Sequence, residues 1–230
     1  MATSLSKHAS RRSFLKDNGL SIALLMLFAF SVIGHFFAGW GTENEERLQH
    51  GDAALGAMAF LASGAFLSSL FENWESEFLQ MWTYVMLTAY LFQRGSPESK
   101  DPEGGAVQDR DPKLDEDNPD APLPVRSGGA LRVLYAHSLG LTMLLLFLAS
   151  FVLHFLNSRR DAADQAEAHG LAGPSLAEHV VSWQFWFESF QNWQSEFLAT
   201  GLLVILGIYL RERGSPESKR VAAPLSETGT

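Results

Sequence analysis

The chain has 230 residues, no cysteine and a formal net charge of −9 at pH 7. The lack of cysteine excludes disulfides and thiolate metal sites, and the acidity argues against a nucleic-acid partner. The mean hydropathy is close to zero, but this value averages strongly apolar segments with a polar remainder. The class of protein must therefore be read from the distribution of apolar residues along the chain.

The first 18 residues are basic, and we predict that they form a cytoplasmic N-terminus. The pattern SRRSFLK at 10–16 also fits a twin-arginine export signal. We interpret its bases instead as anchors of the next helix, because no convincing small-residue cleavage site follows. The uncharged run at 20–37 is about the length that crosses a bilayer, which predicts a transmembrane helix over about 19–38.

A second apolar run, at 78–92, is too short to cross a bilayer alone. At about 1.5 Å per residue it reaches roughly 22 Å, whereas the hydrocarbon core is about 30 Å thick. The helix must therefore extend backward through the polar block FENWESEFL, which predicts a transmembrane helix over about 70–93. Polar groups then enter the outer leaflet.

The segment 101–131 is rich in acids and prolines and has a Gly-Gly pair at each end. This composition is typical of a solvated linker, and we predict that the segment is disordered.

The second half of the chain repeats the first. A shift of 119 residues aligns 15–100 with 134–219 without a gap, and 31 of the 86 positions are identical. The identities are densest in two blocks, NWxSEF and RGSPESK. We therefore predict two hairpins, at 19–100 and 132–219. The second hairpin has transmembrane helices over about 135–157 and 189–212, and a cytoplasmic tail at 220–230 follows it.

The predicted fold is an all-α membrane protein of four transmembrane helices in two tandem, parallel-repeat hairpins. Each repeat has an even number of spans, so both copies insert in the same sense. Lys and Arg are concentrated at the termini and in the linker, which predicts that both ends are cytoplasmic. The outer loops should carry interfacial helices, at 55–70 and at 174–187, where Ser175 and Glu178 form a capping box.

Polar residues shared by the repeats form a candidate intramembrane cluster. Four-residue spacing puts Ser31 with His35, and Ser150 with His154, on one helical face. Counted from the cytoplasmic end, each hairpin could bring a His and a Glu to the same depth. The candidate residues are His35, Asn73, Glu77, His154, Asn192 and Glu196. They could form a proton relay or a divalent-metal site, or they could only satisfy buried polar groups and stabilise the bundle.

In the RGSPESK block, we expect Arg94 in a last helical turn, Gly95 in the left-handed conformation and Pro97 as a stop signal. The same expectations hold for the second copy at 213–219. A contact between its basic residues and lipid headgroups or a partner is a further hypothesis.

The stretches RRSFLKDNGLS, FENWESEFLQ and RGSPESK resemble a bacterial family of uncharacterised integral membrane proteins, a domain of unknown function. The resemblance implies four helices and the bacterial cytoplasmic (inner) membrane, and it implies no residue roles. We find no phosphate loop, nucleophile elbow, HExxH or paired-cysteine motif, so an enzyme, a cofactor or a bound metal is not expected.

The leading hypothesis is a structural or interaction protein of the bacterial envelope. One alternative is a small proton or ion conductor that uses the pairs His35/Glu77 and His154/Glu196, and a less favoured one is a membrane-bound metalloenzyme. The expected partners are the lipid bilayer and a second copy or another membrane protein.

Overall fold

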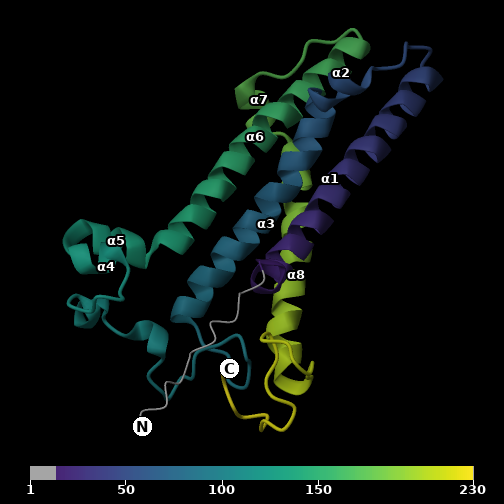
Figure 1. Ribbon diagram of the computed structural model, residues 1–230. Coiled ribbons are helices and arrows are strands. Elements are labelled where there is room, and N and C mark those ends of the chain that lie inside the picture. The colour runs from purple at the N-terminus through teal and green to yellow at the C-terminus, as the bar shows by residue number, and fades with distance from the viewer. Residues whose placement is uncertain (1–13, 230) are drawn as a thin grey trace, which may run out of the picture. The chain divides into compact units, whose positions relative to one another are not determined.

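The computed structural model describes residues 14–229, which are helical apart from turns and loops and include no strand (Figure 1). The predicted all-α class is therefore confirmed for this part of the chain. Residues 1–13, with most of the predicted basic N-terminus and the arginines of the export-like pattern, lie outside the described residues, as does Thr230. The chain divides into two compact units, 1–62 and 63–230.

The first unit is one long helix and a short return segment. Helix α1 spans Phe14–Gln49 and α2 spans Ala57–Leu61. The chain between them is fastened to the end of α1, because the Trp40 indole N–H donates to the Leu55 carbonyl at 2.7 Å and the Asn44 carboxamide oxygen accepts from the Leu55 N–H at 2.6 Å.

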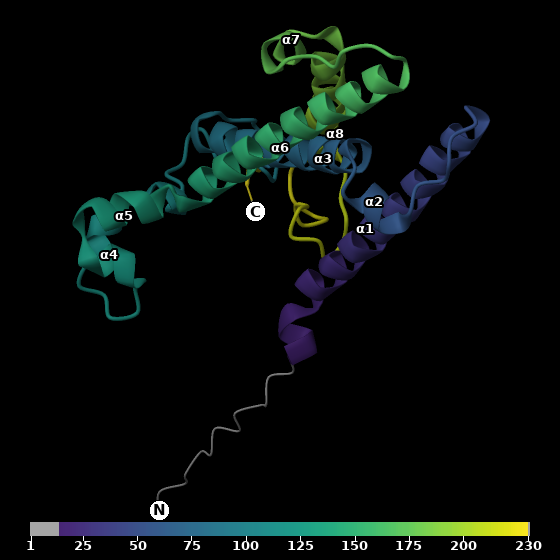
Figure 2. The ribbon, with the colours of Figure 1, turned by 90° about the horizontal axis from the view of Figure 1, so that it is seen from above.

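The second unit is built on three long helices: α3, Gly64–Tyr90; α6, Ser138–Ala168; and α8, Trp183–Tyr209. Helix α6 runs along α3, which also contacts α8 (Figure 2). Ser63 and Ser182 start α3 and α8 by accepting a hydrogen bond from a first-turn N–H, as helix N-caps do.

Helices α3 and α6 approach closely at both ends. A Cβ atom added to Gly64, at the start of α3, would lie 2.6 Å from the backbone nitrogen of Asp161, near the end of α6. At the opposite end, a Cβ on Gly140 would lie 3.2 Å from the sulfur of Met86. The two helices are thus antiparallel and packed over most of their length.

Short elements connect these helices: η1, Val107–Asp109; η2, Pro112–Asp115; α4, Leu123–Ser127; α5, Gly129–Ala136; and α7, Leu176–Val180. Helices η1, η2 and α4 lie in the segment 101–131 that was predicted to be a disordered linker, and Glu116 of this segment is paired at 2.6 Å with Arg132 of α5, just beyond it. The disorder of this segment in solution stays a prediction. The capping box of Ser175 and Glu178 is confirmed at the start of α7.

Two helices, α1 and α6, are long and apolar enough to cross a membrane. Helices α3 and α8 are also long, but neither has a stretch as apolar as those of α1 and α6, because each contains the polar block. The burial pattern also differs from that of a soluble protein, because large apolar side chains of α1, α6 and α8 are exposed. Most side chains buried among the described residues are polar: Ser68, Glu75, Ser76, Ser96, Ser99, Ser150, His154, Ser158, His179, Ser189 and Lys219.

The two RGSPESK blocks form matching turns beyond the ends of α3 and α8. The helices end at Tyr90 and Tyr209, so the prediction that Arg94 and Arg213 lie in a last helical turn is wrong. The residue after each helix is already extended, and serine side chains then hold the chain in the turn. The predicted left-handed glycine is confirmed, since Gly95 has φ +83°.

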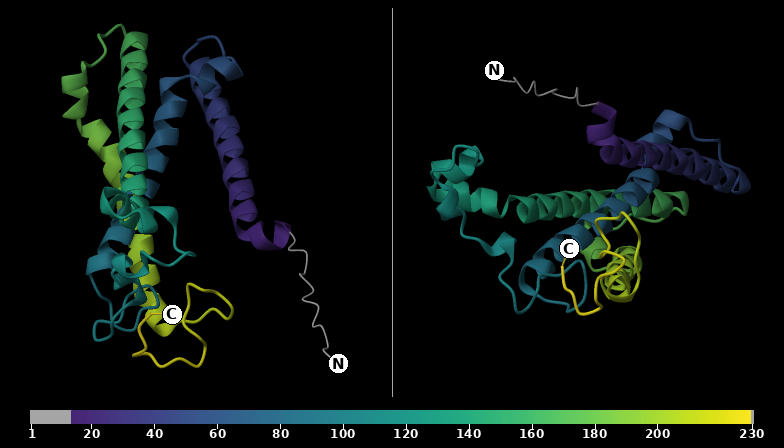
Figure 3. Two further views of the ribbon diagram at one scale, coloured as in Figure 1. Left: turned by 60° about the vertical axis from the view of Figure 1, so that its left-hand side comes forward. Right: turned by 60° about the horizontal axis from the view of Figure 1, so that its bottom comes forward.

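The same serine contacts build both turns. In the first, the Ser99 hydroxyl accepts from the Gln93 N–H at 2.8 Å and the Ser96 hydroxyl accepts from the Glu98 N–H at 3.2 Å. Equivalent bonds of 2.9 and 3.2 Å hold the second turn. The C-terminal tail lies beside the first of these turns (Figure 3), where the Gly229 N–H donates to the Ser96 carbonyl oxygen at 2.9 Å.

Candidate functional site: a buried ionisable network

The network begins on α6, whose buried residues are Ser150, His154 and Ser158. They follow one another at four-residue intervals, so they form one stripe along the helix. The shared face predicted for Ser150 and His154 is thus present. As far as Leu156 the rest of α6 is largely apolar and its large apolar side chains are exposed, so the buried polar stripe faces the neighbouring helices.

His154 lies between two carboxyl groups that come from different helices. Its Nδ1 atom is 2.7 Å from an oxygen of Glu75 on α3, and its Nε2 atom is 3.3 Å from an oxygen of Glu188 on α8. His154 and Glu75 are fully buried, and Glu188 is mostly buried. Both ring nitrogens therefore face carboxyl oxygens, away from bulk water.

The network continues from Glu188 toward the loop before α8. The Ser158 hydroxyl donates to Glu188 at 2.7 Å, and the Nε2 atom of His179, on α7, lies 3.1 Å from the same hydroxyl. Since the Ser158 proton points to Glu188, His179 must donate through Nε2. Burial lowers the pKa of His179, which favours this neutral form.

Further polar groups complete the hydrogen bonding around the carboxylates. The Trp193 indole N–H donates to Glu75 at 3.0 Å, and the side chain of Asn192 donates to Glu72, one turn earlier on α3. The ring of Phe185, which is fully buried, lies 5.1 Å from the imidazole of His154 and 5.6 Å from that of His179. The network is thus enclosed and well supplied with donors.

The contacts of His154 determine how many protons the site holds. A hydrogen bond between an imidazole nitrogen and a carboxyl oxygen requires one proton, so the two contacts of His154 require two. These protons reside on a charged imidazole, or are shared with Glu75 and Glu188. The arrangement is therefore suited to binding protons and moving them. Among residues 14–229, no group of three or more His, Asp and Glu side chains is arranged to hold a metal ion.

The residues singled out in the sequence lie in different surroundings. His154 and Asn192 belong to the network. Asn73 donates to a carbonyl oxygen of its own helix. Glu196 lies near Glu77, close enough for the carboxyl groups to interact, and neither contacts His154 in the described structure. His35 lies in the first unit, where it is partly buried.

The residues that form the centre of the network with His154 were not among the sequence candidates: Glu75, Ser158, His179 and Glu188. The sequence candidates are residues that the two repeats share, whereas these four lie where the repeats differ. At a shift of 119 residues their counterparts are Gln194, Gly39, Phe60 and Ser69. One feature of the sequence could have pointed to Ser158: it lies four residues after His154 and therefore on the same face of the helix.

These features define an all-α protein with two helices of membrane-crossing length and an enclosed network of ionisable side chains. The chain belongs to a family described as a domain of unknown function, DUF6766, whose profile matches residues 11–230. The resemblance to a family of unknown function is thus confirmed. No curated protein matches the chain, and no solved structure matches it.

Proposed function

We propose that this chain is a four-helix integral membrane protein of the bacterial inner membrane that takes up and passes protons through the network around His154. Helices α1, α3, α6 and α8 are the membrane spans, arranged as two parallel hairpins with both termini in the cytoplasm. Glu75, His154 and Glu188 form the central relay, and His179 connects it to the outer side.

Helix length and residue distribution support four spans. Helices α3 and α8 each have 27 residues, or about 40 Å at 1.5 Å per residue, which exceeds a hydrocarbon core of about 30 Å. Exposed apolar and buried polar side chains suit a lipid environment, where polar groups must be satisfied inside the protein.

The element boundaries support the tandem repeat. Helix α2 spans Ala57–Leu61 and α7 spans Leu176–Val180, so a shift of 119 residues superimposes their bounds. The same shift superimposes α3 on α8, including the capping serines and the turns that follow. Helices α1 and α6 also end at equivalent positions.

The observation that carries the proton function is the position of His154, fully buried with a carboxyl group against each ring nitrogen. Ionisable groups within a membrane are costly and commonly mark proton or ion pathways. Histidine changes its protonation near neutral pH and can accept a proton on one nitrogen while it releases one from the other. A chain of such groups between helices is the arrangement that a relay requires.

A structural role for the same network is the second candidate. Glu75, His154 and Glu188 join three helices, and breaking a buried ionic contact is strongly destabilising, by about 3–5 kcal/mol. In that case the network would only fix the packing of α3, α6 and α8, and the protein would act as a scaffold or an interaction partner in the envelope.

Proton uptake into liposomes separates the two candidates. Protein is reconstituted with an internal pH-sensitive dye, and uptake is driven by a potassium diffusion potential. Wild-type protein should acidify the interior faster than empty liposomes. We expect Glu75→Gln and Glu188→Gln to slow uptake about tenfold or more, because general acid–base groups typically contribute effects of that size or larger.

Glutamine has the shape of glutamate and keeps hydrogen-bonding capacity, so these variants should fold, which circular dichroism and gel filtration would check. Glu167→Gln is the matched control, because it removes an exposed carboxylate from α6 and should leave uptake unchanged. Wild-type uptake equal to that of empty liposomes would exclude the proton function and leave the structural role.

A further inference from the structure

A second pair of acids lies where the two RGSPESK turns meet. Glu98 of the first turn is partly buried, and the Tyr84 hydroxyl donates to its Oε2 at 2.5 Å. Its Oε1 is buried and accepts no hydrogen bond among the described residues. The neighbouring group is the carboxyl of Glu217, which holds the equivalent position in the second turn.

A proton between these acids would supply the missing hydrogen bond. Two ionised carboxylates are both acceptors, so neither can satisfy the other. A proton on either one supplies the donor that Oε1 of Glu98 lacks, and it relieves the repulsion. Burial, followed by the proximity of Glu217, raises the pKa of Glu98, in agreement with this geometry.

Among residues 14–229, neither Glu98 nor Glu217 forms an ion pair with a cation. Lys100, in the same turn as Glu98, lies 2.8 Å from an oxygen of Asp109 on η1 and donates to the Ala89 carbonyl oxygen at 2.8 Å. Its charge is therefore compensated by Asp109. Tyr84 from α3 and Glu217 from the second turn interact with Glu98, and the Lys100–Asp109 ion pair lines the same pocket as Glu98.

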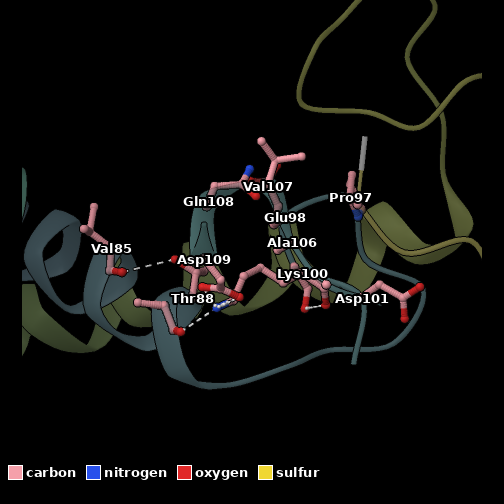
Figure 4. Close-up of a pocket in the computed structure, with 14 residues that line it drawn as sticks. Val85, Thr88, Pro97, Glu98, Lys100, Asp101, Ala106, Val107, Gln108 and Asp109 are labelled. Atoms are coloured by element: carbon pink, nitrogen blue, oxygen red, sulfur yellow. Dashed lines mark hydrogen bonds and ion pairs between the residues drawn. The ribbon is translucent and has the colours of Figure 1, made fainter. Parts of the chain in front are cut away.

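Glu98 also lines an open pocket of about 640 Å³ at the end of α3 (Figure 4). Thr88, Lys100 and Asp109 form part of its wall. Because the pocket is open, solvent can reach the side of Glu98 that lines it.

A row of polar side chains on α3 lies between the acid pair and the buried network. Glu72, Ser76, Gln80 and Tyr84 follow at four-residue intervals on one face, about 6 Å apart along the axis. Gln80 donates to the Thr200 hydroxyl of α8, so the row faces a polar partner midway. It begins beside the relay and ends at Glu98.

We propose that Glu98 and Glu217 share one proton and form the cytoplasmic loading site of the relay. A hydronium ion in the pocket loses one O–H bond as an O–H bond forms on one of the two carboxyls, and the proton then passes toward the relay along the row, from Tyr84 to Glu72. Only O–H and N–H bonds form and break. The assignment as a loading site rests on the proposed function, whereas the shared proton does not.

Infrared spectroscopy tests the shared proton directly. In membranes titrated from acid to alkaline pH, the wild type should keep a carboxylic-acid carbonyl band after exposed carboxyls have ionised. Glu98→Gln and Glu217→Gln should each remove this band from the difference spectrum. Glu103→Gln is the matched control, because Glu103 is exposed and paired with Arg94 at 2.6 Å. A band that persists in Glu98→Gln would overturn the proposal.

Proton uptake tests the role in loading and distinguishes the two proposals. The Glu98→Gln variant should reduce uptake severalfold when the cytoplasmic side is kept alkaline, and less when it is acidic. Loss of the infrared band without any wild-type uptake would refute the proton function and retain the acid pair. Uptake that depends on Glu75 but not on Glu98 or Glu217, with an unchanged band, would refute the acid pair alone.

Discussion

At the scale of single residues, His179 is a neutral member of the network whose contact depends on pH. His179 is almost fully buried, with 2% of its surface exposed, and touches the network through one hydroxyl. Burial lowers its pKa, so the folded protein binds a proton there less readily than the unfolded chain does.

The sign of this shift predicts an acid-sensitive contact. Above the ordinary histidine pKa of about 6.5, His179 is neutral in both states and its contribution to stability is complete. As the pH falls below that value, protonation of the unfolded form weakens the attachment of α7. We expect hydrogen–deuterium exchange of Leu176–Val180, corrected for intrinsic rates, to accelerate severalfold between pH 7.5 and 5.5.

A histidine in the same loop region provides the control. His169 is exposed, so His169→Gln should keep the acid sensitivity of α7, whereas His179→Gln should remove it. Equal exchange at both pH values in the wild type would contradict the assignment.

At the scale of elements, the contact between α3 and α6 depends on a glycine. The Cβ of an alanine at position 64 would meet the backbone of Asp161 at 2.6 Å, where no flexible side chain can yield. We expect Gly64→Ala to destabilise the protein by about 1–3 kcal/mol, as overpacking typically does. Thermal unfolding in detergent would show this as a lower Tm.

The comparison variant is Gly201→Ala on α8, where an added Cβ meets no atom within 4 Å. Alanine favours the helix over glycine by about 1 kcal/mol, so this variant should unfold at the same or a higher temperature. A decrease in Tm of similar size for both variants would argue against close packing as the cause.

Local elements could be predicted from the sequence, whereas the partners of the site could not. The all-α class, the capping box at Ser175 and the left-handed Gly95 depend on nearby residues and were found correctly. The partner of His154 depends on which helix α6 packs against. Counting depth along each hairpin pointed to Glu196, but contact with α3 brings in Glu75, 79 residues away in the sequence. Helix pairing of this kind leaves no local pattern.

At the scale of the whole second unit, a buried lysine holds the C-terminal tail. Lys219 is 2% exposed, and its ammonium donates to the carbonyl oxygens of Pro224, Leu225 and Glu227 at 3.3, 3.1 and 3.0 Å. The tail then reaches the first turn, where the Gly95 N–H donates to the Thr228 hydroxyl at 2.8 Å. The tail therefore links the two turns.

Removing this ammonium should release the tail. Lys219→Met leaves three carbonyl groups without their shared donor, and we expect digestion by a carboxypeptidase to become about tenfold faster, as a lost charged hydrogen bond of roughly 1.5–3 kcal/mol implies. Arg220→Met is the control, because its contact with Glu227 is on the surface, where ion pairs contribute little. Equal digestion of wild type and Lys219→Met would contradict the role of Lys219.

The way the two turns are built has a consequence for how a duplicated chain evolves. Each turn is held by hydrogen bonds between its own serines and its own backbone. A substitution of these serines therefore disrupts the turn in whichever copy it occurs, whatever packs against that copy. The buried acids depend instead on partners from other helices, and the protein needs only one network of this kind, with Glu75 and Glu188 on either side of His154. The turns would therefore stay alike after duplication, while one copy of each acid position was free to change. Gln194 now stands opposite Glu75, and Ser69 stands opposite Glu188. Divergence between the halves then marks the place where they specialised.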